Sequence, residues 1–395
     1  MKLQDFIIFV LFFLVSCHSG TKKSVHGEAL TIIDISKNYP EKEMILQDIA
    51  DIEYVSLETS DDVLLGNAPY LEYVSDNYIF LFDVMQGEMF IFNRKGEIVT
   101  HFNRRGQGGQ EYPFNVTNIV FDEKHEEIFV FSVIKVLVYT LKGEYKRSFN
   151  LDDLNLIRNA SNFNDETLLV YYDYQPPRKN YENPYFLISK KDGSIVSVLD
   201  INFPVRYANS IIQTIDVGGQ TYSTRLRINV FNNIYYGQDF VISDISSDTI
   251  FLLTQNLELA PLLARKPSVH ASEPRKVWTA QLMTDKFIIL EIKTLDFIAA
   301  EEGRPAPPVV TLIHFFETKE TFKLSILNAE YSMGKWFPPD GRDAPAIAKN
   351  MSANWMQPHR LIEAYKDNQL KGEFEKFVAT LDEDDNPIVR ILKFK

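Results

Sequence analysis

The sequence contains a single cysteine, Cys17, and this scarcity excludes several kinds of chemistry. No disulfide can form within the chain, and no set of thiolates can hold a metal. A chain of this size without disulfides must therefore depend on a large apolar core. The 29 Phe and 19 Tyr residues can supply that core.

Long apolar runs and an excess of basic residues are also missing. After residue 15 no apolar run approaches the roughly 18 residues of a membrane-spanning helix. The formal net charge is −13, which argues against binding to nucleic acid, because phosphates require a basic patch. The same acidity argues against lying flat on an anionic membrane surface.

The N-terminus has the pattern of a secretory signal peptide. Lys2 precedes an uninterrupted apolar run from Phe6 to Val15, which is too short to span a bilayer. The run ends in Leu14-Val15-Ser16-Cys17, which looks like a bacterial lipobox. We therefore predict a signal peptide over 1–16 and lipidation of Cys17 by acyl chains that anchor the protein. A buried, unmodified cysteine is the alternative.

A short polar segment follows the cysteine and predicts a flexible tether over 17–30. An aspartate directly after the cysteine would be expected for retention in the inner membrane, and none directly follows Cys17. The acidic residues that surface-exported lipoproteins tend to carry there are also absent, since the first one is Glu28. We predict the outer membrane, with the protein on its periplasmic face.

From about Leu30 onward the chain is predicted to be β-structure nearly throughout. Short runs of Ile, Val, Phe and Tyr alternate with turns. A unit of two hairpins has its last turn at Gly96, again at Gly143 and again at Gly193, each followed by an outgoing strand. Later copies near Leu257 and Lys319 lack the glycine but keep the pattern. A repeated unit of two hairpins, roughly 40–50 residues or more in length, is typical of a β-propeller blade.

Five such turns predict five blades, and a sixth blade is expected to join the chain ends. The segments 52–57 and 388–394 both have strand patterns, and their pairing would close the ring. We therefore predict one all-β domain over 31–395, a six-bladed β-propeller with four-stranded blades. Residues 344–378 are predicted to be a short helical insertion, residues 151–160 a helical turn or loop, and residues 171–184 a long loop.

Two further motifs give the chain a resemblance to a known family. Arg104-Arg105-Gly106-Gln107-Gly108-Gly109-Gln110-Glu111-Tyr112 is close to the linker between NHL blades, and Ser247-Asp248-Thr249-Ile250-Phe251 matches a recurrent strand start. The chain resembles the six-bladed β-propeller lipoproteins of Bacteroidetes, whose blades are NHL-like or TolB-like. The resemblance covers about residues 33–395. It implies a fold and export, but no reaction.

The candidate ligand-binding residues are two arginines and two tyrosines. Arg104 and Arg105 could bind a carboxylate or sulfate, or could form solvated ion pairs between blades. Tyr172 and Tyr174 could stack on sugars together with Trp278, Trp336 and Trp355, or could serve as rigid packing.

No catalytic residue and no metal or other cofactor is predicted from these patterns. The seven histidines form no pair with metal-ligand spacing, and His314 is expected to be packed within an apolar strand or the lumen. The run 382–386 could bind calcium, but its spacing fits a solvated turn better. The segment 106–110 lacks the Lys-Ser/Thr and the helix of a phosphate loop.

We therefore predict a lipid-anchored binding or scaffolding module of the cell envelope, whose partner is a protein or a glycan. We expect the protein to contact the membrane only through Cys17, and the sequence does not predict the oligomeric state. The alternative is a propeller hydrolase or lyase, similar to a lactonase or a glycosidase, with its site at the central channel.

Overall fold

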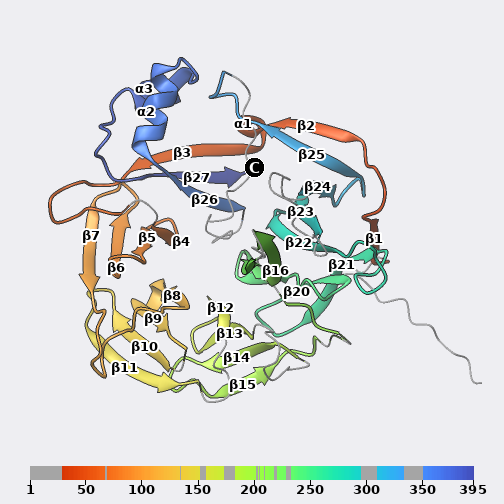
Figure 1. Cartoon of the computed structure of the whole chain (residues 1–395), viewed down its shortest axis with the longest axis horizontal. Helices are drawn as coiled ribbons and strands as arrows, with labels where there is room; N and C mark the ends of the chain where they lie inside the picture. Colours follow the sequence, from red (N-terminus) through yellow and green to blue (C-terminus); the bar gives the residue numbers. More distant parts are fainter. Residues whose placement is uncertain are drawn as a thin grey trace, which may run out of the picture.

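The computed structural model describes residues 29–66, 69–133, 135–151, 157–172, 183–201, 203, 205–208, 210–217, 220–227, 233–294, 309–332 and 350–395. Six sheets stand around a common axis, and the chain passes from one to the next in sequence order (Figure 1). The predicted six-bladed β-propeller is therefore confirmed. The predicted signal peptide, Cys17 and most of the tether lie outside the described residues.

The first three blades each consist of four antiparallel strands, with the first strand nearest the axis (Figure 1). Their strands are β4 (Tyr70–Val74), β5 (Tyr78–Asp83), β6 (Glu88–Asn93) and β7 (Ile98–Asn103); β8 (Asn118–Asp122), β9 (Glu127–Phe131), β10 (Lys135–Thr140) and β11 (Tyr145–Asn150); and β12 (Ile157–Asn162), β13 (Thr167–Tyr172), β14 (Tyr185–Ser189) and β15 (Ile195–Val198). A short 3-10 helix, η1 (Glu123–His125), joins β8 to β9.

The next two blades have a fifth, outermost strand that comes from the N-terminal segment. Their own strands are β18 (Asn233–Tyr236), β19 (Asp239–Ile242), β20 (Thr249–Leu253) and β21 (Leu259–Lys266); and β22 (Lys276–Met283), β23 (Phe287–Thr294), β24 (Val310–Phe315) and β25 (Thr321–Leu327). β1 (Thr31–Asp34) pairs with β21, and β2 (Glu41–Ile45) pairs with β25, both in parallel. A hairpin, β16 (Ser210–Val217) and β17 (Gln220–Arg227), precedes β18. The sequence did not predict the two added strands.

The sixth blade closes the ring as predicted. Its described strands are β26 (Met351–Met356), β27 (Ile388–Phe394) and β3 (Ala50–Ser56), and β27 lies between the other two. β27 and β3 are antiparallel, with Ile391 opposite Glu53. The short helix α1 (Leu46–Ile49) leads from β2 into β3.

The predicted helical insertion is present, and residues 344–349 of its predicted range lie outside the described residues. It consists of α2 (Pro358–Lys366) and α3 (Gly372–Val378), which lie between β26 and β27 at the rim of the ring (Figure 1). Residues 351–356 of the predicted range form β26 instead. The prediction of a helical turn or loop over 151–160 is wrong for its last residues, because Ile157–Asn162 is strand β12, which pairs with β13.

Six apolar clusters hold the blades together, one at each interface between neighbouring blades. Strand β5 shows why its sequence is apolar at nearly every position. Ile79 and Leu81 pack on the side of the sixth blade, whereas Phe80 and Phe82 pack on the side of the second. Since successive side chains of a strand point to opposite faces, a strand buried on both faces must be apolar throughout.

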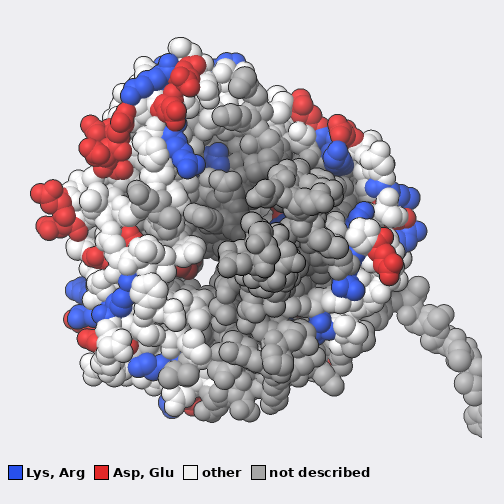
Figure 2. Space-filling view, viewed as in Figure 1, with Lys and Arg blue, Asp and Glu red and all other residues white. Residues whose placement is uncertain are grey.

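The charged side chains surround this core at the rim. Figure 2 shows acidic and basic atoms interspersed around one face, with the largest acidic gathering near α2 and α3. No helix in the described part of the chain is both long and apolar enough to cross a membrane.

Candidate functional site

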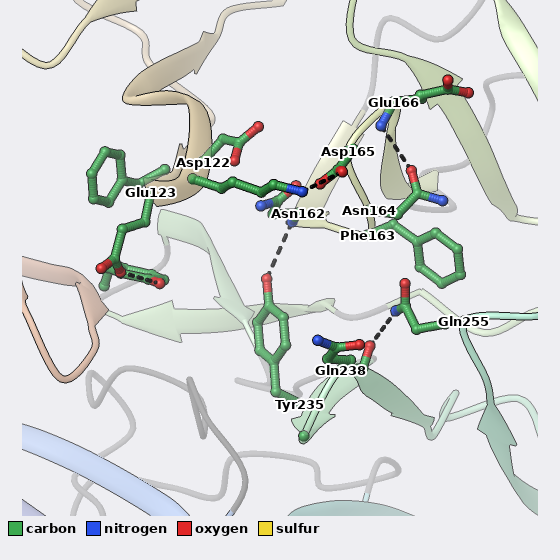
Figure 3. Close-up of a pocket in the computed structure, with 14 residues that line it drawn as sticks. Asp122, Glu123, Asn162, Phe163, Asn164, Asp165, Glu166, Tyr235, Gln238 and Gln255 are labelled. Atoms are coloured by element: carbon green, nitrogen blue, oxygen red, sulfur yellow. Dashed lines mark hydrogen bonds and ion pairs between the residues drawn. The ribbon is translucent and has the colours of Figure 1, made fainter.

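A cavity of about 840 Å³ opens where the innermost strands of the first four blades end. Each of β4, β8, β12 and β18 contributes its last residues or the turn that follows it. The lining residues are Tyr73, Phe121, Asp122, Glu123, Lys124, Asn162, Phe163, Asn164, Asp165, Glu166, Tyr235, Gly237, Gln238 and Gln255 (Figure 3). Because ring stacking brings these strand ends together, no continuous segment of sequence contains the site.

Aromatic rings form part of the cavity wall. Tyr73 and Tyr235 are partly exposed, whereas Phe121 and Phe163 are buried behind them. Tyr73 packs edge-on against Phe121, with ring centroids 5.3 Å apart. Burial raises the pKa of Tyr235 to about 12, so its hydroxyl remains protonated at neutral pH. The cavity thus offers apolar ring surface beside hydroxyl groups, an arrangement that can contact a sugar or a peptide.

Hydrogen bonds between blades fix the polar side chains of the lining. The Tyr73 hydroxyl donates to Glu123 Oε2 at 2.8 Å, and Asn77 Nδ2 donates to Glu123 Oε1 at 2.6 Å. On the other side, the backbone N–H of Asn162 donates to the Tyr235 hydroxyl at 3.1 Å. These bonds join the first blade to the second and the third to the fourth, and Figure 3 shows the one between Asn162 and Tyr235.

Two of the four carboxylates in the lining have cationic partners. Asp122 is buried and receives Lys190 Nζ at 2.6 Å and His125 Nδ1 at 2.8 Å. Asp165 is exposed and pairs with Lys124 across the boundary between the second and third blades. The hydrogen bond from Lys124 holds the pKa of Asp165 below its usual value. The other two carboxylates, Glu123 and Glu166, form no ion pair within the described residues.

A further carboxyl group belongs to the innermost strand of the first blade. Glu72 stands at a β-bulge in β4, where the pairing with β5 shifts between Leu71 and Tyr73. Burial raises the pKa of its carboxyl to about 7. This acid therefore titrates near neutral pH, one residue away from Tyr73.

The two predicted arginines lie outside this cavity. Arg104 Nε donates to the carbonyl of Gly143 at 2.9 Å. Arg105 donates to the carbonyls of Met85 and Val84, and its guanidinium lies 4.7 Å from the ring centroid of Phe114. Both guanidinium groups thus bind protein carbonyls at the connection between the first two blades. Their predicted role in binding an anion stays a prediction.

The predicted aromatic platform is not brought together within the described residues. Tyr172 is buried in β13, with 2 % of its surface exposed, and Tyr174 lies outside the described residues. Trp278 is buried in the core, Trp355 is half-buried in β26, and Trp336 lies outside the described part. Its role in sugar binding also stays a prediction.

The remaining sequence motifs have structural surroundings. His314 is buried within β24, where its Nδ1 lies 3.0 Å from Thr321 Oγ1. In the acidic run, Asp385 accepts from the backbone N–H of Asp382, and the buried Asn386 donates to the carbonyls of Glu58 and Val63. Among the described residues, no group of three or more His, Cys, Asp and Glu side chains could hold a metal ion.

Sequence reasoning missed every residue of the cavity lining. The repeat did carry one usable signal, since Tyr73, Asn162 and Tyr235 stand at or near the ends of the first strands of their blades. Those positions converge on the axis in any propeller.

Comparison with known proteins gives a family and a fold. Residues 30–299 match the family model described as "Domain of unknown function (DUF4934)". A crystal structure from Bacteroides fragilis, of a protein described as a candidate for export, matches with a TM-score of 0.63 at 12 % identity. That match covers 92 % of this chain and 100 % of the other.

A second crystal structure, of a DUF4221 family member from Bacteroides vulgatus, matches with a TM-score of 0.47 at 10 % identity. It covers 88 % of this chain and 99 % of the other. No curated protein matches the sequence.

Proposed function

Because the chain belongs to the DUF4934 family, whose description assigns no activity, we propose its function from the cavity: it is a cell-envelope binding protein whose ligand occupies the mouth formed by the first four blades. The observation that carries this proposal is the cavity itself, which combines aromatic, amide and carboxylate groups from four blades. Its volume of about 840 Å³ is within the range of ligand sites in proteins.

The bonding of three of the four carboxylates in the lining favours binding over catalysis. Asp122 and Asp165 are neutralised by lysines, and Glu123 is held by two donors. Carboxylates fixed in this way suit recognition, because a general acid or base must be free to exchange a proton with its substrate. We therefore keep the binding module as the proposed function in preference to a hydrolase or lyase.

Placement in the envelope rests on the N-terminal sequence. The apolar run, Cys17 and the polar segment that follows support a lipid anchor at the periplasmic face of the outer membrane. The description of the Bacteroides fragilis protein as a candidate for export supports export, which this placement requires. The NHL-like motif over 104–112 supports membership of the wider group of propeller lipoproteins.

The anchor is tested by substitution of Cys17. We expect Cys17→Ser to abolish labelling of the protein by radioactive palmitate in a bacterial host. Serine removes the thiol that is alkylated and leaves the signal sequence otherwise unchanged. Equal labelling of both forms would contradict the anchor.

The binding function is tested by blocking the cavity. Gln238→Trp places a large side chain at an exposed lining position, and Gln107→Trp adds the same side chain at an exposed position outside it. The full chain is titrated by calorimetry with neutral oligosaccharides and with short peptides. We expect one class to bind saturably, with binding lost in Gln238→Trp and kept in Gln107→Trp. Absence of binding to either class would overturn the proposal.

A further inference from the structure

We infer that the cavity recognises a cation, the lysine or arginine side chain of an extended peptide segment, and that Glu123 is the group that binds it. The inference rests on the proposed function, because it names the ligand of the same cavity. It comes from the differences between the four carboxylates of the lining.

Glu123 differs from Asp122 and Asp165 in the donors that hold it. Both of its oxygens accept hydrogen bonds, but the donors are the Tyr73 hydroxyl and the Asn77 amide, which are neutral. No cationic side chain in the described ranges pairs with it, whereas Lys190 and Lys124 pair with the other two. The negative charge of a half-buried carboxylate is therefore oriented but not neutralised.

The surroundings of Glu123 favour a cation in a second way. The ring of Tyr73 is partly exposed at the cavity, and a ring face attracts a cationic group. Burial, followed by the charge of Glu123, raises the pKa of Tyr73 far above its ordinary value. The phenol therefore stays protonated, keeps donating to Glu123 and adds no negative charge of its own.

The two lysines nearest the lining carboxylates are paired with Asp122 and Asp165, not with Glu123. Lys190 lies beneath the surface against Asp122, with 5 % of its surface exposed. Lys124 is already paired with Asp165 on the third blade. With four carboxylates and one lysine, the lining as a whole is acidic, so it repels an anionic glycan.

The opposite wall suits a peptide backbone. Asn162, Gln238 and Gln255 stand on the third and fourth blades, opposite the Glu123 side (Figure 3). Amide side chains both donate and accept, as the peptide groups of an extended segment require. A neutral sugar could use these amides too, but it would leave the charge of Glu123 without a partner. The observations thus favour a basic peptide segment of a partner protein.

The test uses pentapeptides that differ only in charge. The full chain is titrated by calorimetry with a peptide that carries a central lysine or arginine, and with matched peptides that carry norleucine or citrulline there. We expect the charged peptides to bind at least tenfold more tightly, and their affinity to fall as salt rises. Glu123→Gln should remove this preference, whereas Glu126→Gln, an exposed acid in the same turn, should keep it.

The other outcomes are distinct. The protein could instead bind neutral oligosaccharides and not charged peptides, with that binding lost in Gln238→Trp. This result would overturn the inference that the ligand is cationic, but it would support the proposed function. Equal effects of Glu123→Gln and Glu126→Gln would overturn the role of Glu123. Salt dependence of the wild-type protein is measured without any variant, so a failure of Glu123→Gln to fold leaves the inference testable. Absence of all binding would overturn the proposed function itself.

Discussion

The turn glycines show at the scale of single residues how neighbouring blades approach each other. Gly96, Gly143 and Gly193 all have positive φ, and a Cβ at any of them would collide with the outer strand of the preceding blade. Leu257 and Lys319, at the corresponding turns of later blades, also have positive φ. The turn is thus retained where the glycine is lost, as the sequence pattern indicated.

Gly143→Ala is predicted to lower the free energy of unfolding by about 2–4 kcal/mol. Its φ of 76° disfavours a side chain, and the added Cβ would lie 2.3 Å from Phe102 Cγ. Gly372→Ala is the matched control, because its φ of 69° is similar but no atom lies within 4 Å of the added Cβ. It should cost only about 1 kcal/mol. Urea denaturation measures both, and equal losses would show that packing against Phe102 does not matter.

His314 is predicted to make stability depend on pH. Burial, followed by the charge of Lys319, lowers its pKa from 6.5 to about 4. Between these values the unfolded chain binds a proton that the folded chain refuses, so stability falls as pH falls from 6.5 to 4. The maximal loss from this group is about 3 kcal/mol.

His314→Leu should flatten that part of the pH profile, measured by urea denaturation between pH 7 and 4. Only the slope of the free energy of unfolding against pH is compared, because the substitution also removes the contact with Thr321 and so changes stability at every pH. His359→Leu, at an exposed position on α2, should leave the slope unchanged. An unchanged slope in His314→Leu would contradict the lowered pKa.

At the scale of the element, the N-terminal segment acts as an outer belt. β1, β2 and β3 cover the outer edges of the fourth, fifth and sixth blades in turn (Figure 1). Paired edges no longer offer free N–H and C=O groups to other chains. The belt also inserts apolar side chains into the interfaces, such as Ile33 between the fourth and fifth blades.

Ile33→Ala is predicted to lower the free energy of unfolding by about 2–4 kcal/mol, because the side chain is 1 % exposed in that cluster. Its neighbour Ile32 is 60 % exposed on the same strand, so Ile32→Ala should change stability by less than about 0.5 kcal/mol. Chemical denaturation of both variants tests whether β1 belongs to the cooperative fold. Similar small effects would show that it frays independently.

The same strands show what sequence could and could not predict. Hairpin turns leave local signals, such as a glycine after a pair of apolar runs, and these predicted the blades. β1 and β2 pair in parallel with strands far along the chain, without a turn between them, so nothing local marks their partners. The cavity is hidden for a related reason, since Tyr73, Asn162 and Tyr235 meet only after four blades have stacked. Arg104 and Arg105 were candidate ligand-binding residues because they are adjacent charges, but in the structure they bind backbone carbonyls.

At the scale of the whole molecule, the ring is closed by strands from both ends of the chain. β27 lies between β26 and β3, so the last strand joins the N-terminal belt to the sixth blade. Asn386 strengthens the closure, because its side chain also accepts from the backbone N–H of Leu65 at 2.8 Å. The cavity lies across the first four blades, and its geometry therefore depends on the ring remaining closed.

Ile391→Ala tests whether the ring unfolds as one unit. Ile391 is fully buried in β27 at the interface of the sixth and first blades, so its truncation should cost about 2–5 kcal/mol. If opening the closure opens the whole ring, hydrogen exchange followed by mass spectrometry should show equal losses of protection in β27 and in β9 of the second blade. A loss confined to the sixth blade would mean that blades open separately. In that case the cavity would persist after the sixth blade has opened, and ligand binding would not depend on closure of the ring.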